Sequence, residues 1–386
     1  MMRITRTLSV FTILALLFSA TACRLSYVLH AAAGQVRLLH HSIPVEEALK
    51  KDTLGPDQRE RLHLVAQVKA FGEKELGLRE TENYQTVYLK SHQPPIYVVA
   101  ASPKDRLVRK TWWFPVVGQM PSLGFFDKEL ATAEKEKLLK NDLDVIMGVA
   151  DAYSTLGWFQ DPVTLNLLEG STVDLVEIIL HEMTHTTLYL KDEGEFNEGL
   201  AVLVGKVGAF QFLEKTFGSS DPLTMEAKKN LEDERIFSSF LASLLQQLER
   251  LYGSPISYKE KLNQREKVFE RSLVKFDEIK GQLQTDRFAH FGSAKMNNAY
   301  LLSIGLYHRH FHLFEAILKE KENSIQETIL FLRQFAKEEG DIFKRLQDRL
   351  RRTETLHLYA RNFLAALPIS STSGLKKTAL VYENKK

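Results

Sequence analysis

The pattern of hydrophobic and polar positions changes several times along the chain. From residue 24 to about residue 80, apolar residues recur at helical spacing and predict helices. Between Asn83 and Val117, short β-prone runs separated by prolines predict strands. Lys128 to Lys140 is a charged segment that predicts a helix, and Asp144 to Thr155 predicts another strand. From Phe196 to about Leu367, apolar spacing with few helix-breaking residues predicts long helices.

This pattern predicts an α+β fold that is mainly helical, in which a small mixed or antiparallel sheet is flanked and followed by helices. The expected organisation has five parts. They are a signal peptide (1–22), an N-terminal helical segment (23–82), a core with strands and helices (83–217), a helical C-terminal region that completes the cleft (218–368), and a flexible tail (369–386).

The N-terminus has the features of a targeting signal. Arg3 and Arg6 precede an apolar run from Leu8 to Phe18, which is shorter than a membrane span. Small residues at 19–22 then lead to Cys23, an order that resembles a bacterial lipoprotein signal. The resemblance implies that Cys23 is lipidated and that the protein is anchored in the cell envelope, facing the periplasm. The alternative is a plain signal peptide with an incidental cysteine.

Composition excludes several classes of protein. Lys and Arg total 51 against 49 for Asp and Glu, so the net charge of +2 provides no field for nucleic acid, and we expect no nucleic-acid partner. One cysteine in 386 residues excludes a disulfide scaffold and a cysteine-rich zinc module. The chain also lacks the glycine motifs of phosphate loops, dinucleotide folds and serine hydrolases.

The clearest chemical motif is an HExxH sequence at residues 181–185. A helix is expected to start near Ser171, because Ser171 followed by Asp174 suits an N-cap. On that helix, His181 and His185 lie one turn apart on the same face and can reach one metal ion. Glu182 lies beside them, where it could act on a water bound to the metal. The alternative is a surface pair of histidines.

A catalytic zinc site needs three protein ligands and one open position. A carboxylate on the next element could supply the third ligand if the two helices pack antiparallel. Glu198 is the first choice, and Glu193 and Glu195 are its rivals, with Glu195 the main competitor. Asn197, Glu193 and Glu195 are candidates for a second shell that orients the histidines.

The segment His181–His185 followed by Asn197–Ala201 resembles the gluzincin class of zinc peptidases, in which an NExxA-type helix supplies a glutamate ligand. The chain is more similar to the bacterial family of predicted aminopeptidases, which are lipoproteins. The similarity runs from Cys23 to about Leu318 and includes four further blocks: Tyr27–Gln35, Ala152–Phe159 with Asp161-Pro162, Asn297–Ala299, and Tyr307.

The resemblance implies a zincin-like core at 83–217 and a zinc-dependent peptidase, expected to be an aminopeptidase acting on a peptide or protein. One Zn²⁺ would be held by His181, His185 and Glu198, with Glu182 as general base. Tyr307 is a candidate for stabilising the oxyanion, although a core or surface tyrosine is its alternative role.

Other features leave two interpretations open. Ala152 to Leu156 could bind an extended peptide through its backbone or be an ordinary strand. His40, His41 and His357 are expected to face solvent, and Trp112-Trp113 to pack in the core or sheet. The second hypothesis for the whole chain is a non-catalytic envelope lipoprotein that binds a partner and keeps a structural or vestigial zinc site.

Overall fold

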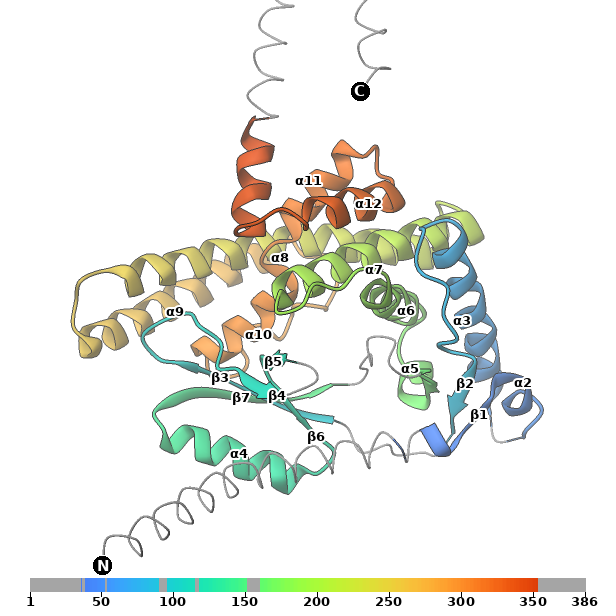
Figure 1. The fold of residues 1–386 in the computed structure, drawn as a ribbon, viewed down its shortest axis with the longest axis horizontal. Coiled ribbons are helices and arrows are strands. Elements are labelled where there is room, and N and C mark those ends of the chain that lie inside the picture. Colours follow the sequence, from blue (N-terminus) through green and yellow to red (C-terminus); the bar gives the residue numbers. More distant parts are fainter. Residues whose placement is uncertain are drawn as a thin grey trace, which may run out of the picture. The chain divides into compact units, whose positions relative to one another are not determined.

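A computed structural model describes residues 36, 39–52, 54–89, 96–114, 118–150 and 160–352 (Figure 1). The expected signal peptide, Cys23, the block at 152–159, His357 and the tail from 369 lie outside the described residues. Contacts group the described residues up to Ile329 into one compact unit and those from Leu330 onward into a second.

The helices are α2 (Val45–Ala48), α3 (Pro56–Lys74), α4 (Lys128–Lys140), α5 (Leu165–Glu169), α6 (Thr172–Thr187), α7 (Gly194–Phe217), α8 (Pro222–Gly253), α9 (Tyr258–Lys280), α10 (Asn298–His308), α11 (Phe311–Glu320) and α12 (Ile325–Phe335). The strands are β1 (Ser42–Pro44), β2 (Thr86–Tyr88), β3 (Ile96–Pro103), β4 (Trp112–Phe114), β5 (Gly118–Met120), β6 (Leu123–Phe125), β7 (Leu143–Ala150) and β8 (Val163–Thr164). The fold is therefore α+β and mainly helical, as predicted.

The larger sheet has the strand order β6-β3-β7 and is antiparallel throughout. Helix α4 packs on one face of the sheet and α10 on the other (Figure 1). Trp112 is buried in the core between the sheet and α4, as expected, whereas Trp113 is 54% exposed because alternate residues of β4 face opposite sides.

A second small sheet has the order β1-β2-β8 and corrects one prediction. Residues 24–80 were expected to be helical, but Ser42–Pro44 is a strand that pairs antiparallel with Thr86–Tyr88. A strand of three residues carries no recognisable periodicity, and it forms here because a partner distant in sequence pairs with its backbone.

Helices α6 and α7 form the centre of the larger unit. Their apolar side chains include the fully buried Ile179, Leu180 and Leu203. Most of α7 is buried from Phe196 to Leu213, which is typical of a core helix covered on every side, and only its last turn is exposed. Helices α3, α8, α10 and α11 all pack against this pair or one of its members.

Helix α10 is fixed to the larger sheet by a buried polar cluster. The carboxylate of Asp144 accepts hydrogen bonds from the backbone N–H of Asn298 at 3.0 Å and from Arg265 Nη1 at 2.7 Å. The side-chain amide of Asn298 donates to the carbonyl of Pro103 at 2.9 Å. Asn297 caps the helix by accepting from the N–H of Tyr300. These contacts set the position of Tyr307 at the other end of α10.

None of the described helices is both long enough and apolar enough to span a membrane.

Candidate metal centre

The two histidines of the HExxH motif lie one turn apart on α6. The helix begins as predicted, because Ser171 Oγ accepts a hydrogen bond from the N–H of Asp174 at 3.0 Å. It continues without interruption to Thr187, so both imidazoles lie on the same face. The Nε2 atoms of His181 and His185 are 3.2 Å apart.

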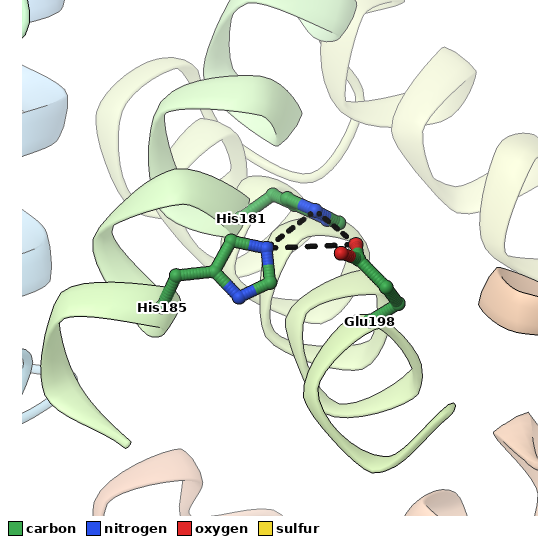
Figure 2. A group of neighbouring side chains, drawn as sticks. All are labelled: His181, His185 and Glu198. Atoms are coloured by element: carbon green, nitrogen blue, oxygen red, sulfur yellow. Dashed lines mark hydrogen bonds and ion pairs between the residues drawn. The ribbon is translucent and has the colours of Figure 1, made fainter. Parts of the chain in front are cut away.

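Glu198 of α7 approaches both imidazoles (Figure 2). Its Oε2 atom lies 3.2 Å from His181 Nε2 and 3.5 Å from His185 Nε2. These three residues are the group of possible metal ligands that the described part of the chain contains. Two neighbouring helices thus bring three donor atoms to one point.

The spacing of these atoms fits a zinc ion. Ligands at about 2.0–2.2 Å from a tetrahedral ion lie about 3.3–3.6 Å from one another, and the three observed distances are 3.2, 3.2 and 3.5 Å. Two imidazoles and one carboxylate also form a donor set that zinc prefers. The residues present therefore fit the ion that the motif implies.

Glu182 supplies a second observation that fits a reactive centre. Its Oε2 atom is buried and accepts no hydrogen bond from any described residue. A buried carboxylate oxygen without a partner is costly unless a water or substrate group completes it. The arrangement leaves Glu182 able to take a proton beside the ligand group.

The close contact between α6 and α7 depends on two glycines of α7. A Cβ atom at Gly205 would lie 2.8 Å from the backbone oxygen of Glu177 and 3.4 Å from His181 Cβ. At Gly208, it would lie 2.9 Å from Leu180 Cδ1. Sequence reasoning missed both glycines, although two glycines three residues apart in a helical segment are a signal of close helix packing.

Asn197 holds the turn between α6 and α7. Its side chain accepts from the N–H of Leu190 at 2.8 Å and donates to the carbonyl of Leu190 at 2.7 Å. Asn197 was a candidate for orienting a histidine, but both of these side-chain hydrogen bonds go to the backbone of Leu190. It therefore fixes where α7 starts and, through that, where Glu198 lies.

Glu195, the rival third ligand, lies outside the ligand group. Its two carboxylate oxygens bind Arg109 Nη1 at 2.8 Å and His310 Nε2 at 2.8 Å. Burial opposes the ionisation of Glu195, but His310 and Arg109 outweigh it and lower the pKa of the carboxyl to about 2. Glu195 is thus a firmly ionised carboxylate that is already paired. The remaining rival, Glu193, also lies outside the ligand group.

Tyr307 lies beside His181. Its ring stacks on that of His181, with 6.3 Å between the ring centroids. Tyr307 is 38% exposed, but partial desolvation of the phenol and the charges of Glu198 and Glu182 raise its pKa well above the usual value of 10. The hydroxyl therefore keeps its proton and can donate a hydrogen bond.

Electrostatic interactions link Glu198 to the histidines of the ligand group. Burial opposes the ionisation of Glu198, but hydrogen bonds to His181 and His185 hold the pKa of its carboxyl far below the usual range. Burial also opposes protonation of His185, yet the hydrogen bond and charge of Glu198 raise its pKa. Glu198 is thus an ionised carboxylate that shares protons with the histidines, and a metal ion could take the place of those protons.

A buried network of charges lies behind the ligands, and sequence reasoning missed it. Lys206 of α7 is 4% exposed and lies between two carboxylates, 3.4 Å from Glu177 and 3.6 Å from Glu234. Glu234 of α8 also binds His308 Nδ1 at 2.6 Å. No local pattern marks these residues, because they come from four helices that meet only in the fold.

Comparisons with known proteins place the chain in a family. A sequence model of the family described as "Putative aminopeptidase" matches residues 26–347. The search of curated proteins gave no match, and the search of solved structures gave none either. Because the family model covers most of the chain, the chain belongs to this aminopeptidase family.

Proposed function

We propose that the protein is a zinc-dependent peptidase with a zincin-like core, and that His181, His185 and Glu198 hold one zinc ion. The convergence of these three donor atoms at 3.2–3.5 Å carries the proposal. When bound there, zinc would polarise the scissile carbonyl and make a bound water acidic. Membership of the aminopeptidase family supports peptide-bond hydrolysis as the reaction.

Glu182 is the proposed general base. Its buried Oε2 atom has no hydrogen-bond partner among the described residues, so it is free to accept a proton from the attacking water. The same carboxylic acid then gives the proton to the nitrogen of the leaving amine, which returns Glu182 to its ionised form.

Tyr307 is proposed to stabilise the oxyanion. Its hydroxyl stays protonated because partial desolvation and two nearby carboxylates raise its pKa. A hydrogen-bond donor held beside the ligand group can stabilise the negative charge that develops in the transition state more than it stabilises the substrate.

We further propose that the peptidase removes residues from the free N-terminus of its substrate, as an aminopeptidase does. An aminopeptidase must recognise an α-ammonium group, for which a carboxylate is the natural partner. Glu195 lies one turn from Glu198, but both of its oxygens already pair with positively charged or donor groups. Glu195 is therefore poorly suited to this task.

The test compares wild type with Glu182→Gln on peptide libraries with free and acetylated N-termini. The substitution keeps the shape of the side chain and removes its proton acceptor, so we expect activity to fall about 10²- to 10⁴-fold while the zinc content stays the same. Cleavage of free N-termini alone would identify an aminopeptidase. A zinc-loaded wild type as inert as Glu182→Gln on both libraries would instead support the non-catalytic binding lipoprotein.

We also propose that Cys23 anchors the protein to the bacterial envelope, with the body facing the periplasm, because the basic, apolar and small residues before it have lipoprotein order. Cys23→Ser should release the protein from the membrane fraction and abolish incorporation of labelled fatty acid. An unchanged membrane fraction and label would contradict the anchor.

A further inference from the structure

We infer that Glu195 is a positioning residue, which acts through a three-part clamp with Arg109 and His310 to hold Tyr307 beside the metal ligands. This inference rests on the proposed function, because it concerns how the proposed oxyanion donor is placed. The name "clamp" refers below to these three residues only.

The clamp joins three segments that are distant in sequence. Glu195 lies in the first turn of α7, one turn before Glu198. Arg109 lies on the connection between β3 and β4, and His310 is the N-cap residue of α11. Glu195 Oε1 accepts from Arg109 Nη1, and Oε2 accepts from His310 Nε2, both at 2.8 Å. Since an ionised carboxylate only accepts, the Nε2 atom of His310 carries a proton.

These contacts hold α10 on both sides of Tyr307. Arg109 uses its second terminal nitrogen to donate to the carbonyl of Leu302 at 2.9 Å, five residues before Tyr307. His310 lies three residues after it. Between these two points, Leu306 packs so closely against α7 that a Cβ atom at Gly194 would lie 3.3 Å from Leu306 Cδ1. The clamp therefore fixes α10 against the start of α7.

The energetics favour a positioning role. The side chains of Glu195 and Arg109 are each 20% exposed, and that of His310 is 10% exposed. Ion pairs at this depth are weakly screened, and a planar guanidinium that binds two partners has little freedom to reorient. Among the described residues, the hydrogen bonds of Glu195 go to Arg109 and His310 and none goes to a ligand atom, so we expect its effect on the reaction to pass through Tyr307 or Glu198.

The test is a double-mutant cycle between Glu195→Gln and Tyr307→Phe, with kcat, KM and zinc content measured for each variant. We expect Glu195→Gln to lower kcat about tenfold to a hundredfold with zinc content retained, because misplacing a catalytic group by about 1 Å has an effect of this size. In the Tyr307→Phe background, the same substitution should have little further effect. An equal loss in both backgrounds would overturn the inference.

A second measurement does not depend on peptide hydrolysis by the protein. Amide hydrogen exchange of residues 298–310 should accelerate in Glu195→Gln and also in Arg109→Lys, which keeps the charge but loses the planar fork. The matched control is Glu249→Gln, which removes the pair between Glu249 and Arg309 at the same end of α10 without touching α7. Unchanged exchange in both clamp variants would contradict the clamp. If exchange accelerates in the variants but the wild type hydrolyses no peptide, only the proposed peptidase function is contradicted.

Discussion

At the scale of single residues, the site assigns different tasks to chemically similar groups. Glu198 and Glu195 are one turn apart on the same helix, yet one faces two imidazoles and the other faces an arginine and a histidine. Their surroundings, and not their residue type, separate a metal-ligand candidate from a residue that positions others. Glu182 differs from both, because one of its buried oxygens has no partner among the described residues.

Tyr307→Phe tests the oxyanion role. The variant keeps the ring that stacks on His181 and removes only the hydroxyl. We expect kcat to fall about 10²- to 10³-fold, the usual cost of losing one oxyanion donor, with little change in zinc content. Because the pKa of Tyr307 is raised, the donor is present at every pH below its normal titration range, so the ratio of wild-type to variant kcat should be constant from about pH 6 to pH 9. A kcat equal to that of wild type would contradict the role.

At the scale of elements, the site depends on how closely α6 and α7 approach. Gly205 permits this approach at the level of His181, since any side chain there would meet the backbone of α6. Asn197 fixes the turn that joins the two helices. The geometry of the ligands is therefore set by a contact between helix backbones, which is stiffer than a contact between side chains.

Gly205→Ala tests this contact. Alanine favours a helix by up to about 1 kcal/mol over glycine, but its Cβ atom would lie 2.8 Å from a backbone oxygen that cannot move alone. We expect the net effect to be a destabilisation of about 1–3 kcal/mol, together with weaker zinc binding. The matched control is Gly253→Ala at the end of α8, where a Cβ atom meets nothing within 4 Å and stability should be unchanged or slightly higher. Denaturant unfolding measures both, and equal stabilities would contradict the close contact.

At the scale of the larger unit, buried charges connect the helices around the site. Lys206 contacts Glu177 of α6 and Glu234 of α8, and Glu234 contacts His308 of α10. Asp144 similarly connects β7 to Arg265 of α9 and to the start of α10. Each network fixes the position of an element that carries a site residue.

Lys206→Met tests the first network. Methionine fills a similar volume but removes the buried cation between Glu177 and Glu234. Arg287 at 3.1 Å from Glu177 and His308 at 2.6 Å from Glu234 remain, so we expect a loss of about 1–3 kcal/mol of stability, less than for a fully uncompensated buried charge. Lys215→Met is the matched control on the same helix, since Lys215 and its partner Glu75 are 60% and 44% exposed and their pair should contribute less than about 1 kcal/mol. Unfolding free energies that change equally in the two variants would contradict a structural role for the buried network.

Local sequence patterns predicted the elements that carry the site but not the contacts between them. The start of α6 at Ser171, the bounds of α4 and the long helices after Phe196 follow from capping and periodicity, which act within a few residues. The strand at Ser42–Pro44 and the clamp escaped prediction, because each depends on partners that only the fold brings near. Arg109 and Glu195 are 86 positions apart, and Glu195 and His310 are 115 apart.

The most direct test of the central claim is zinc binding by the purified protein, measured as metal content and by calorimetric titration. The account predicts one zinc ion per chain, with loss of about 10²-fold or more in affinity in each of His181→Ala, His185→Ala and Glu198→Ala, and an unchanged stoichiometry in Glu195→Ala. Zinc that binds equally well without His185 or Glu198, or a wild type that binds none, would contradict the account.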